Sequence, residues 1–159
     1  LALGIGANVA MFSVAWPVLA APLPFPDEDR LTVVSLTYQR EGRLARNQVS
    51  VGDYNDWRTA RSFASMAAFS KYFQQVNMTG RGEPQQLAVG SVTAEFFSTL
   101  GVRPLVGRLL QPVDAQRAAR LLVLAERTWR RRFAADPAVV GTTLRLDGVA
   151  YEVIGVAPS

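Results

Sequence analysis

Residues 144–156 read LRLDGVAYEVIGV, and this stretch gives the clearest structural signal in the chain. Its first four residues alternate apolar with polar side chains, the period-two pattern of a strand with one buried face. The Asp147-Gly148 pair suits a two-residue turn in which both residues have positive φ, and residues 151–156 supply the returning strand. The sequence therefore predicts a β-hairpin with Gly148 in a positive-φ turn.

A strand and a helix are predicted directly upstream of this hairpin. Residues 121–124 form a short buried strand candidate, and residues 126–133 a helix with Trp129 and Phe133 on one face. The helix should end around Asp136 and Pro137.

Two further strands are predicted at residues 69–78 and 86–92, joined by a turn at 80–84. After them, Thr93 is placed to cap a short helix, and Gly101 to end it. The side chains that should face inward from this helix are Phe96, Phe97 and Leu100.

Residues 31–58 combine a strand signal with a helix start. Residues 31–38 (LTVVSLTY) are rich in β-formers, and the polar residues 39–47 read as a loop. Ser50 and Asp53 make a capping-box signal for a helix or helix pair. The aromatic and apolar side chains expected to be buried there are Tyr54, Trp57, Phe63 and Met66.

Short strands and helices separated by compact turns indicate an α+β domain after Arg30. A turn-rich stretch at 105–119 suggests a lobe boundary near residue 105. We therefore expect a core at 23–105 and part of a second, small, incomplete lobe at 106–159.

The chain begins with an apolar segment. From residue 1 to 26 it has no charged side chain, which is long enough to cross a bilayer. We interpret residues 1–22 as the C-terminal part of a first transmembrane helix, ended by prolines from Pro22 onward. Two alternatives are a cleaved signal peptide, which Pro22 disfavours, and a buried helix of a soluble protein, which the absence of a polar face disfavours.

Small residues form a stripe along this predicted helix, and in membrane helices such residues usually face other helices. The four residues assigned to helix packing are Ala2, Gly6, Ala10 and Ser13.

The composition argues against an enzyme. The 159 residues include no cysteine and no histidine, and no phosphate-binding loop of the G-x-x-x-x-G-K-[ST] type occurs. We find no candidate catalytic, cofactor-binding or metal-binding residues, and we expect no cofactor. Arg130, Arg131 and Arg132 beside Trp129 are better explained as a solvated helix face, with Glu126 pairing to Arg130, than as a nucleic-acid site.

Five segments together resemble the MacB-like periplasmic core domain of FtsX-type ABC transporter permeases. They are LALGIGANVAMFSV, PLPFPDEDRL, VSVGDYNDWR, FFSTLGVRPLVGRLL and WRRRFAADPAVVGTTLRLDGVAYEVIGVAP, in this order along nearly the whole chain. The resemblance implies a porter-like mixed α/β extracytoplasmic domain and carries over no catalytic residues.

The resemblance also implies a function and partners. The chain would be a fragment of a permease in the bacterial inner membrane, with residues after about Pro26 extracytoplasmic, coupling cytoplasmic ATP hydrolysis to export or mechanotransmission. The implied partners are a cytoplasmic ABC ATPase, a second permease copy, membrane lipid, and a periplasmic adaptor or substrate. The alternative is a membrane-anchored or secreted binding domain with no link to an ATPase; an anchored hydrolase lacks the necessary groups.

The two faces of the predicted transmembrane helix should respond differently to substitution. In the full-length permease, Gly6→Leu should impair assembly, because a large side chain would stand where backbones approach closely. Phe12→Leu keeps an apolar side chain of similar reach and serves as the control. Assembly after detergent extraction is the measurement, and a normal Gly6→Leu protein beside a defective Phe12→Leu protein would show that the packing face is misassigned.

Overall fold

The structure, a computed structural model, describes residues 25–40, 43–47, 49–80, 83–116 and 119–159. The chain divides into two compact units, Leu1–Leu31 and Thr32–Ser159. In the first unit the described residues contain one turn of 3-10 helix, η1 (Glu28–Arg30).

The predicted transmembrane helix at 1–22 lies outside the described residues. Within the described ranges, no helix combines the length and the apolar character that crossing a membrane requires.

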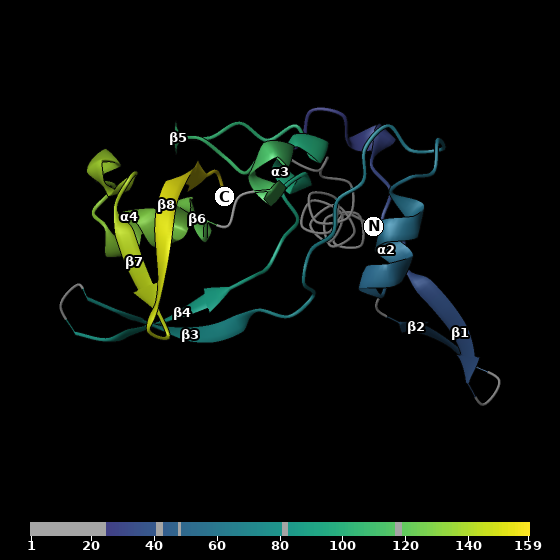
Figure 1. Ribbon diagram of the computed structural model, residues 1–159, viewed down its shortest axis with the longest axis horizontal. Coiled ribbons are helices and arrows are strands. Elements are labelled where there is room, and N and C mark those ends of the chain that lie inside the picture. Colours follow the sequence, from purple (N-terminus) through teal and green to yellow (C-terminus); the bar gives the residue numbers. More distant parts are fainter. Residues whose placement is uncertain (1–24, 41–42, 48, 81–82, 117–118) are drawn as a thin grey trace, which may run out of the picture. The chain divides into compact units, whose positions relative to one another are not determined.

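The second unit is built on a mixed sheet (Figure 1). Among the described residues six strands join it in the order β4-β3-β7-β8-β5, with β6 also paired to β8. The strands are β3 (Gln74–Thr79), β4 (Gln85–Val89), β5 (Val106–Gly107), β6 (Leu121–Ala125), β7 (Thr143–Leu146) and β8 (Val149–Ala157). The sheet thus includes strands from both sides of residue 105.

A separate two-stranded hairpin and several short helices complete the described part of this unit, which makes it a mixed α/β fold. The hairpin consists of β1 (Leu36–Arg40) and β2 (Arg43–Asn47). The helices are α2 (Val51–Trp57), α3 (Phe96–Thr99), η2 (Pro112–Gln116), α4 (Glu126–Arg132) and η3 (Pro137–Val139).

The β7–β8 hairpin is confirmed. Asp147 has φ 46° and Gly148 has φ 80°, the two positive values that a tight Asp-Gly turn needs. The Asp147 carboxylate also accepts a hydrogen bond from the Asn77 backbone N–H at 2.8 Å, and the Asp147 N–H donates to the Asn77 carbonyl at 2.9 Å. The turn residue therefore fastens the hairpin to β3.

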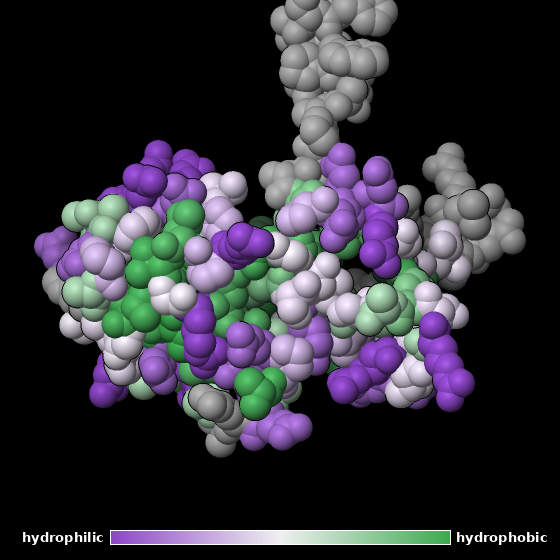
Figure 2. All heavy atoms as spheres, turned by 90° about the horizontal axis from the view of Figure 1, so that it is seen from above, coloured by the Kyte–Doolittle hydropathy of each residue, from purple (hydrophilic) through white to green (hydrophobic). Residues whose placement is uncertain are grey.

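The hydrophobic core lies between this sheet and α4. Trp129 in α4 and Phe133 at its C-cap are both buried, as predicted, although the helix ends at Arg132 and not near Asp136. The Trp129 indole N–H donates to the Asp136 carbonyl at 2.8 Å. The other buried members of the core are Met78, Leu124, Val139, Leu144, Leu146, Val153 and Val156. Figure 2 shows hydrophobic residues gathered over the sheet-bearing part of the molecule with hydrophilic residues around them.

Two glycines allow β5 and β8 to pair. Gly107 and Gly155 stand opposite each other in the antiparallel register. A Cβ on Gly155 would lie 2.8 Å from both the Arg108 nitrogen and the Val106 carbonyl oxygen, closer than real Cβ contacts allow. Gly107 has φ 69°, so a side chain there would also strain the backbone.

Three local predictions near the start of the second unit are wrong. The polar residues at 39–47 do not form a loop, because 43–47 pair with 36–40 as an antiparallel strand, and the strand predicted at 31–38 begins at Leu36. A single helix, α2, forms, and of the side chains expected to be buried there Phe63 is 43% exposed while Tyr54, Trp57 and Met66 are half-buried. A seven-residue helix has about two turns, too few to bury a stripe that extends to residue 66.

The strand and helix predicted at 86–101 are partly confirmed. Strand β4 pairs antiparallel with β3, and Gly101 ends α3 with φ 67°. Thr93, however, does not cap α3; its hydroxyl accepts a hydrogen bond from the Ala68 N–H at 3.1 Å. A side chain that binds a distant backbone group is no longer available to the helix end.

Gly155→Ala should destabilise the second unit. The added methyl group meets backbone atoms, which cannot rotate away as a side chain would, so we expect a loss of about 2 kcal/mol or more in the free energy of unfolding. Gly52→Ala in α2 is the control, since its Cβ would make only an ordinary 3.6 Å contact with Ser50 Oγ and alanine favours helix. Denaturant unfolding of both variants checks this, and equal midpoints would contradict it.

Candidate functional site

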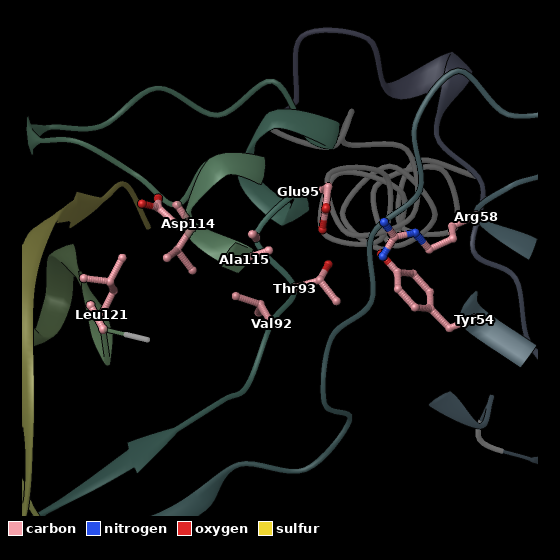
Figure 3. A pocket seen from close by; sticks show the side chains of 11 residues that line it. Tyr54, Arg58, Val92, Thr93, Glu95, Asp114, Ala115 and Leu121 are labelled. Carbon is pink, nitrogen blue, oxygen red and sulfur yellow. The ribbon is translucent and has the colours of Figure 1, made fainter. Parts of the chain in front are cut away.

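A shallow cleft of about 350 Å³ is the candidate site within the second unit. Figure 3 shows Tyr54 and Arg58 of α2 on one side, Asp114, Ala115 and Leu121 on the other, and the residues after β4 between them. The lining residues are Tyr54, Arg58, Val92, Thr93, Ala94, Glu95, Leu110, Asp114, Ala115, Ala119 and Leu121.

The α2 side of the cleft is set by the capping box that the sequence predicts. The Ser50 hydroxyl accepts a hydrogen bond from the Asp53 N–H at 3.1 Å, and the Asp53 carboxylate accepts one from the Ser50 N–H at 3.2 Å. With the helix start fixed, Tyr54 and Arg58 lie one turn apart on the same face. The Tyr54 hydroxyl donates to the Met66 carbonyl at 3.3 Å, which links α2 to the following segment.

The middle of the cleft follows β4. The Thr93 N–H donates to the Ala68 carbonyl at 2.9 Å, and the Thr93 hydroxyl accepts from the Ala68 N–H. This two-way bond fixes the backbone on which Glu95 sits. Arg58 and Glu95 bring charges of opposite sign to the cleft, and the Asp114 carboxylate lines it as well.

The third side is stabilised by a bidentate ion pair. The Arg108 guanidinium donates to the two Asp114 carboxylate oxygens at 2.6 and 3.0 Å, and the Gln111 N–H donates to the same carboxylate at 3.0 Å. The Asp114 side chain is 2% exposed and that of Arg108 is 38% exposed. The hydrogen bond to Asp114 is the main reason that the pKa of Arg108 is raised.

Two of the polar side chains of the cleft are engaged in other contacts. The sequence has no histidine or cysteine, the Tyr54 hydroxyl is hydrogen-bonded to a carbonyl, and Asp114 is occupied by Arg108. In the part of the chain that the structure describes, no three acidic, histidine or cysteine side chains gather as a metal site would require. The arrangement suits weak binding of a polar group.

The structure describes only some of the residues that were singled out from the sequence. The packing stripe of Ala2, Gly6, Ala10 and Ser13 lies outside the described residues and stays a prediction. The predicted Glu126–Arg130 pair is confirmed at 2.8 Å, and it lowers the pKa of Glu126 together with a bond from the Ser159 N–H.

The aromatic neighbours of the arginines on α4 face inward. Trp129 is buried, while Arg130, Arg131 and Arg132 are exposed. A buried indole cannot stack on a base, so the solvated-face interpretation agrees with the structure.

The ion pair between Arg108 and Asp114 was not foreseen from the sequence. An arginine six residues before an aspartate in a turn-rich stretch has no periodicity that distinguishes it from other charges. The one sequence signal for a structural role of Asp114 is the Pro112-Val-Asp114 turn, because an aspartate in a turn commonly accepts a hydrogen bond from a nearby backbone N–H.

The chain matches the family model of the MacB-like periplasmic core domain over residues 1–159. It belongs to that family. Comparison with curated proteins finds no significant match.

Solved structures with the same fold come from transporters and a related permease. The periplasmic region of MacB from Actinobacillus actinomycetemcomitans has a TM-score of 0.62 and 18% identity, covering 70% of this chain and 51% of that one. The extracellular domain of the noncanonic ABC-type transporter YknZ from Gram-positive bacteria has a TM-score of 0.58 and 14% identity, covering 70% and 58%. A domain of a putative permease protein from Porphyromonas gingivalis has a TM-score of 0.54 and 17% identity, covering 79% and 54%.

The chain therefore spans about half the length of these solved domains. At these identities the likeness establishes the fold, which is the mixed α/β fold of MacB-like periplasmic domains.

Removing the guanidinium of Arg108 should destabilise this side of the cleft. Arg108→Leu takes two hydrogen bonds from a buried carboxylate, and we expect it to cost about 1–3 kcal/mol of unfolding free energy, the lower part of the range for buried pairs because Arg108 is partly exposed. Arg131→Leu, at an exposed arginine, should change stability by less than about 0.5 kcal/mol. Equal unfolding midpoints for the two variants would show that the pair contributes nothing to stability.

Proposed function

We propose that this chain is part of an ABC transporter permease, comprising the end of the first transmembrane helix and part of its extracytoplasmic domain. The observation that carries the proposal is the family match across residues 1–159, which includes the uncharged segment 1–26. The permease would lie in the bacterial inner membrane as a dimer, with residues after about Pro26 outside the cytoplasm.

The domain would couple ATP hydrolysis by a cytoplasmic ABC ATPase to export or mechanotransmission. No phosphate-binding loop occurs in the sequence, so the energy has to come from a partner chain or another domain. A closely packed core such as that between α4 and the sheet resists compression and transmits displacement, which is what a mechanical relay requires. An adaptor or substrate would bind outside the membrane, and the mixed-charge cleft is one place for it.

The test uses the full-length permease and the ATPase encoded beside it. Co-purification of the two in detergent, with ATP turnover only when both are present, is the expected result. A reporter enzyme that works only outside the cytoplasm, fused after Ser159, should be active.

The alternative is an anchored or secreted binding domain with no link to an ATPase. An active reporter together with no associated ATPase would favour that alternative and reject the coupling. ATP turnover by the 159-residue chain alone would contradict the proposal outright.

A further inference from the structure

We propose that the exposed aromatic segment 69–73, FSKYF, contacts an anionic lipid surface. It is called the FSKYF segment below. The inference rests on the membrane anchoring proposed above, and it assigns to this segment a role separate from that of the cleft.

The three aromatic side chains of the FSKYF segment are unusually exposed. Phe69, Tyr72 and Phe73 are 58%, 64% and 69% exposed. Single exposed apolar residues are common on proteins, but three large rings within five residues form a patch of the kind that marks an interaction site.

The segment is held in place by its neighbours in the fold. The Ser70 N–H donates to the Ser91 carbonyl at 2.8 Å, and Phe69 forms an isolated β-bridge with Val92. A Cβ on Gly90 would lie 3.2 Å from the Phe73 ring, so the ring lies directly against the Gly90 backbone. The aromatic rings are therefore presented from a fixed backbone, which lowers the ordering cost of binding.

The phenylalanine at the start of the segment has a second support. Its ring centroid lies 5.9 Å from that of Phe96 in α3, and Phe96 in turn lies 5.3 Å from Phe97. One side of Phe69 is thus packed while the other faces solvent.

The charge in this part of the sequence favours lipid phosphate as the partner. Lys71 lies 5.5 Å from the centre of the Tyr72 ring, so a cation stands among the aromatics. From residue 57 to 82 the sequence contains no acidic residue but four basic ones, Arg58, Arg61, Lys71 and Arg81. Aromatic rings favour the headgroup level of a bilayer, and nearby Lys and Arg side chains attract anionic lipids.

Attachment to a membrane anchor allows weak contacts to keep the FSKYF segment at the lipid surface. A domain joined to a membrane anchor meets lipid at high effective concentration, so a few rings and one lysine can maintain contact that would be too weak in a free protein.

The absence of cysteine permits a direct test in the 159-residue chain. Ser70→Cys places one thiol within the segment without removing a ring or the lysine, and Ala150→Cys places one at an exposed position of β8 beside Arg145 and Glu152. Each variant is labelled with a fluorophore and reconstituted into vesicles that carry a lipid-attached quencher. The vesicles contain either zwitterionic lipid alone or zwitterionic and anionic lipid mixed.

We expect the label at position 70 to be quenched by lipid, more in anionic than in zwitterionic vesicles, and the label at position 150 to be quenched much less. Tyr72→Ser with Phe73→Ser should abolish the quenching at position 70. Lys71→Gln should lower the ratio of lipid-contacting to free label about fivefold, the effect of losing one cation at the surface.

Two results would overturn the inference. A label at position 70 that is reached by a water-soluble quencher but not by the lipid quencher shows a free surface. A label reached by neither shows that another part of the protein covers the segment.

Co-sedimentation with the vesicles reports the anchor separately from the label. A chain that fails to sediment counts against the proposed anchoring, whereas a chain that sediments without lipid quenching at position 70 counts against the FSKYF segment alone.

Discussion

The close pairing of β5 with β8 at Gly155 is the constraint on which the second unit depends. Strand β8 pairs with β7, β5 and β6, so it is the one described strand with three partners. Its register with β6 shifts between Val153 and Gly155, which leaves Ile154 as an extra residue, and the Ile154 carbonyl accepts from the Arg108 N–H at 2.9 Å. A side chain at Gly155 would separate these backbones and disturb the strand that contributes Val153 and Val156 to the core.

The elements that the sequence predicts well are those determined within a few residues. The Asp147-Gly148 turn, the capping box of Ser50 and Asp53, and the inward face of α4 each depend on local chemistry that the sequence displays directly. In such places backbone preference and hydrophobic period agree with the tertiary structure, so the elements are found with small errors at their ends.

The features that the sequence does not predict depend on partners far along the chain. The strand β2 has the polar sequence RLARN and forms only because β1 pairs with it. The strand β6 pairs in parallel with β8, although a helix and a strand separate the two in the sequence. Thr93 has the sequence signal of a helix cap, but its hydroxyl accepts a hydrogen bond from the Ala68 N–H instead. The Arg108–Asp114 pair is equally hidden, because an ion pair in a turn leaves no periodic trace in the sequence. Pairing between distant segments overrides local preference in each of these cases.

The distribution of packing in the second unit fits the mechanical coupling proposed above. The fully buried residues of the core belong to the sheet, to α4 with its C-cap Phe133, and to η3, whereas α2 has no fully buried side chain and the aromatics at 69–73 stay exposed. A well-packed domain with a loosely packed edge can move as one unit while that edge makes or breaks contacts with neighbouring molecules. Among the described residues the best-packed part is apolar, and the polar cleft lies beside the less tightly packed α2. Binding in the cleft would therefore exchange contacts of modest strength, as the proposed cycle of coupling and release requires.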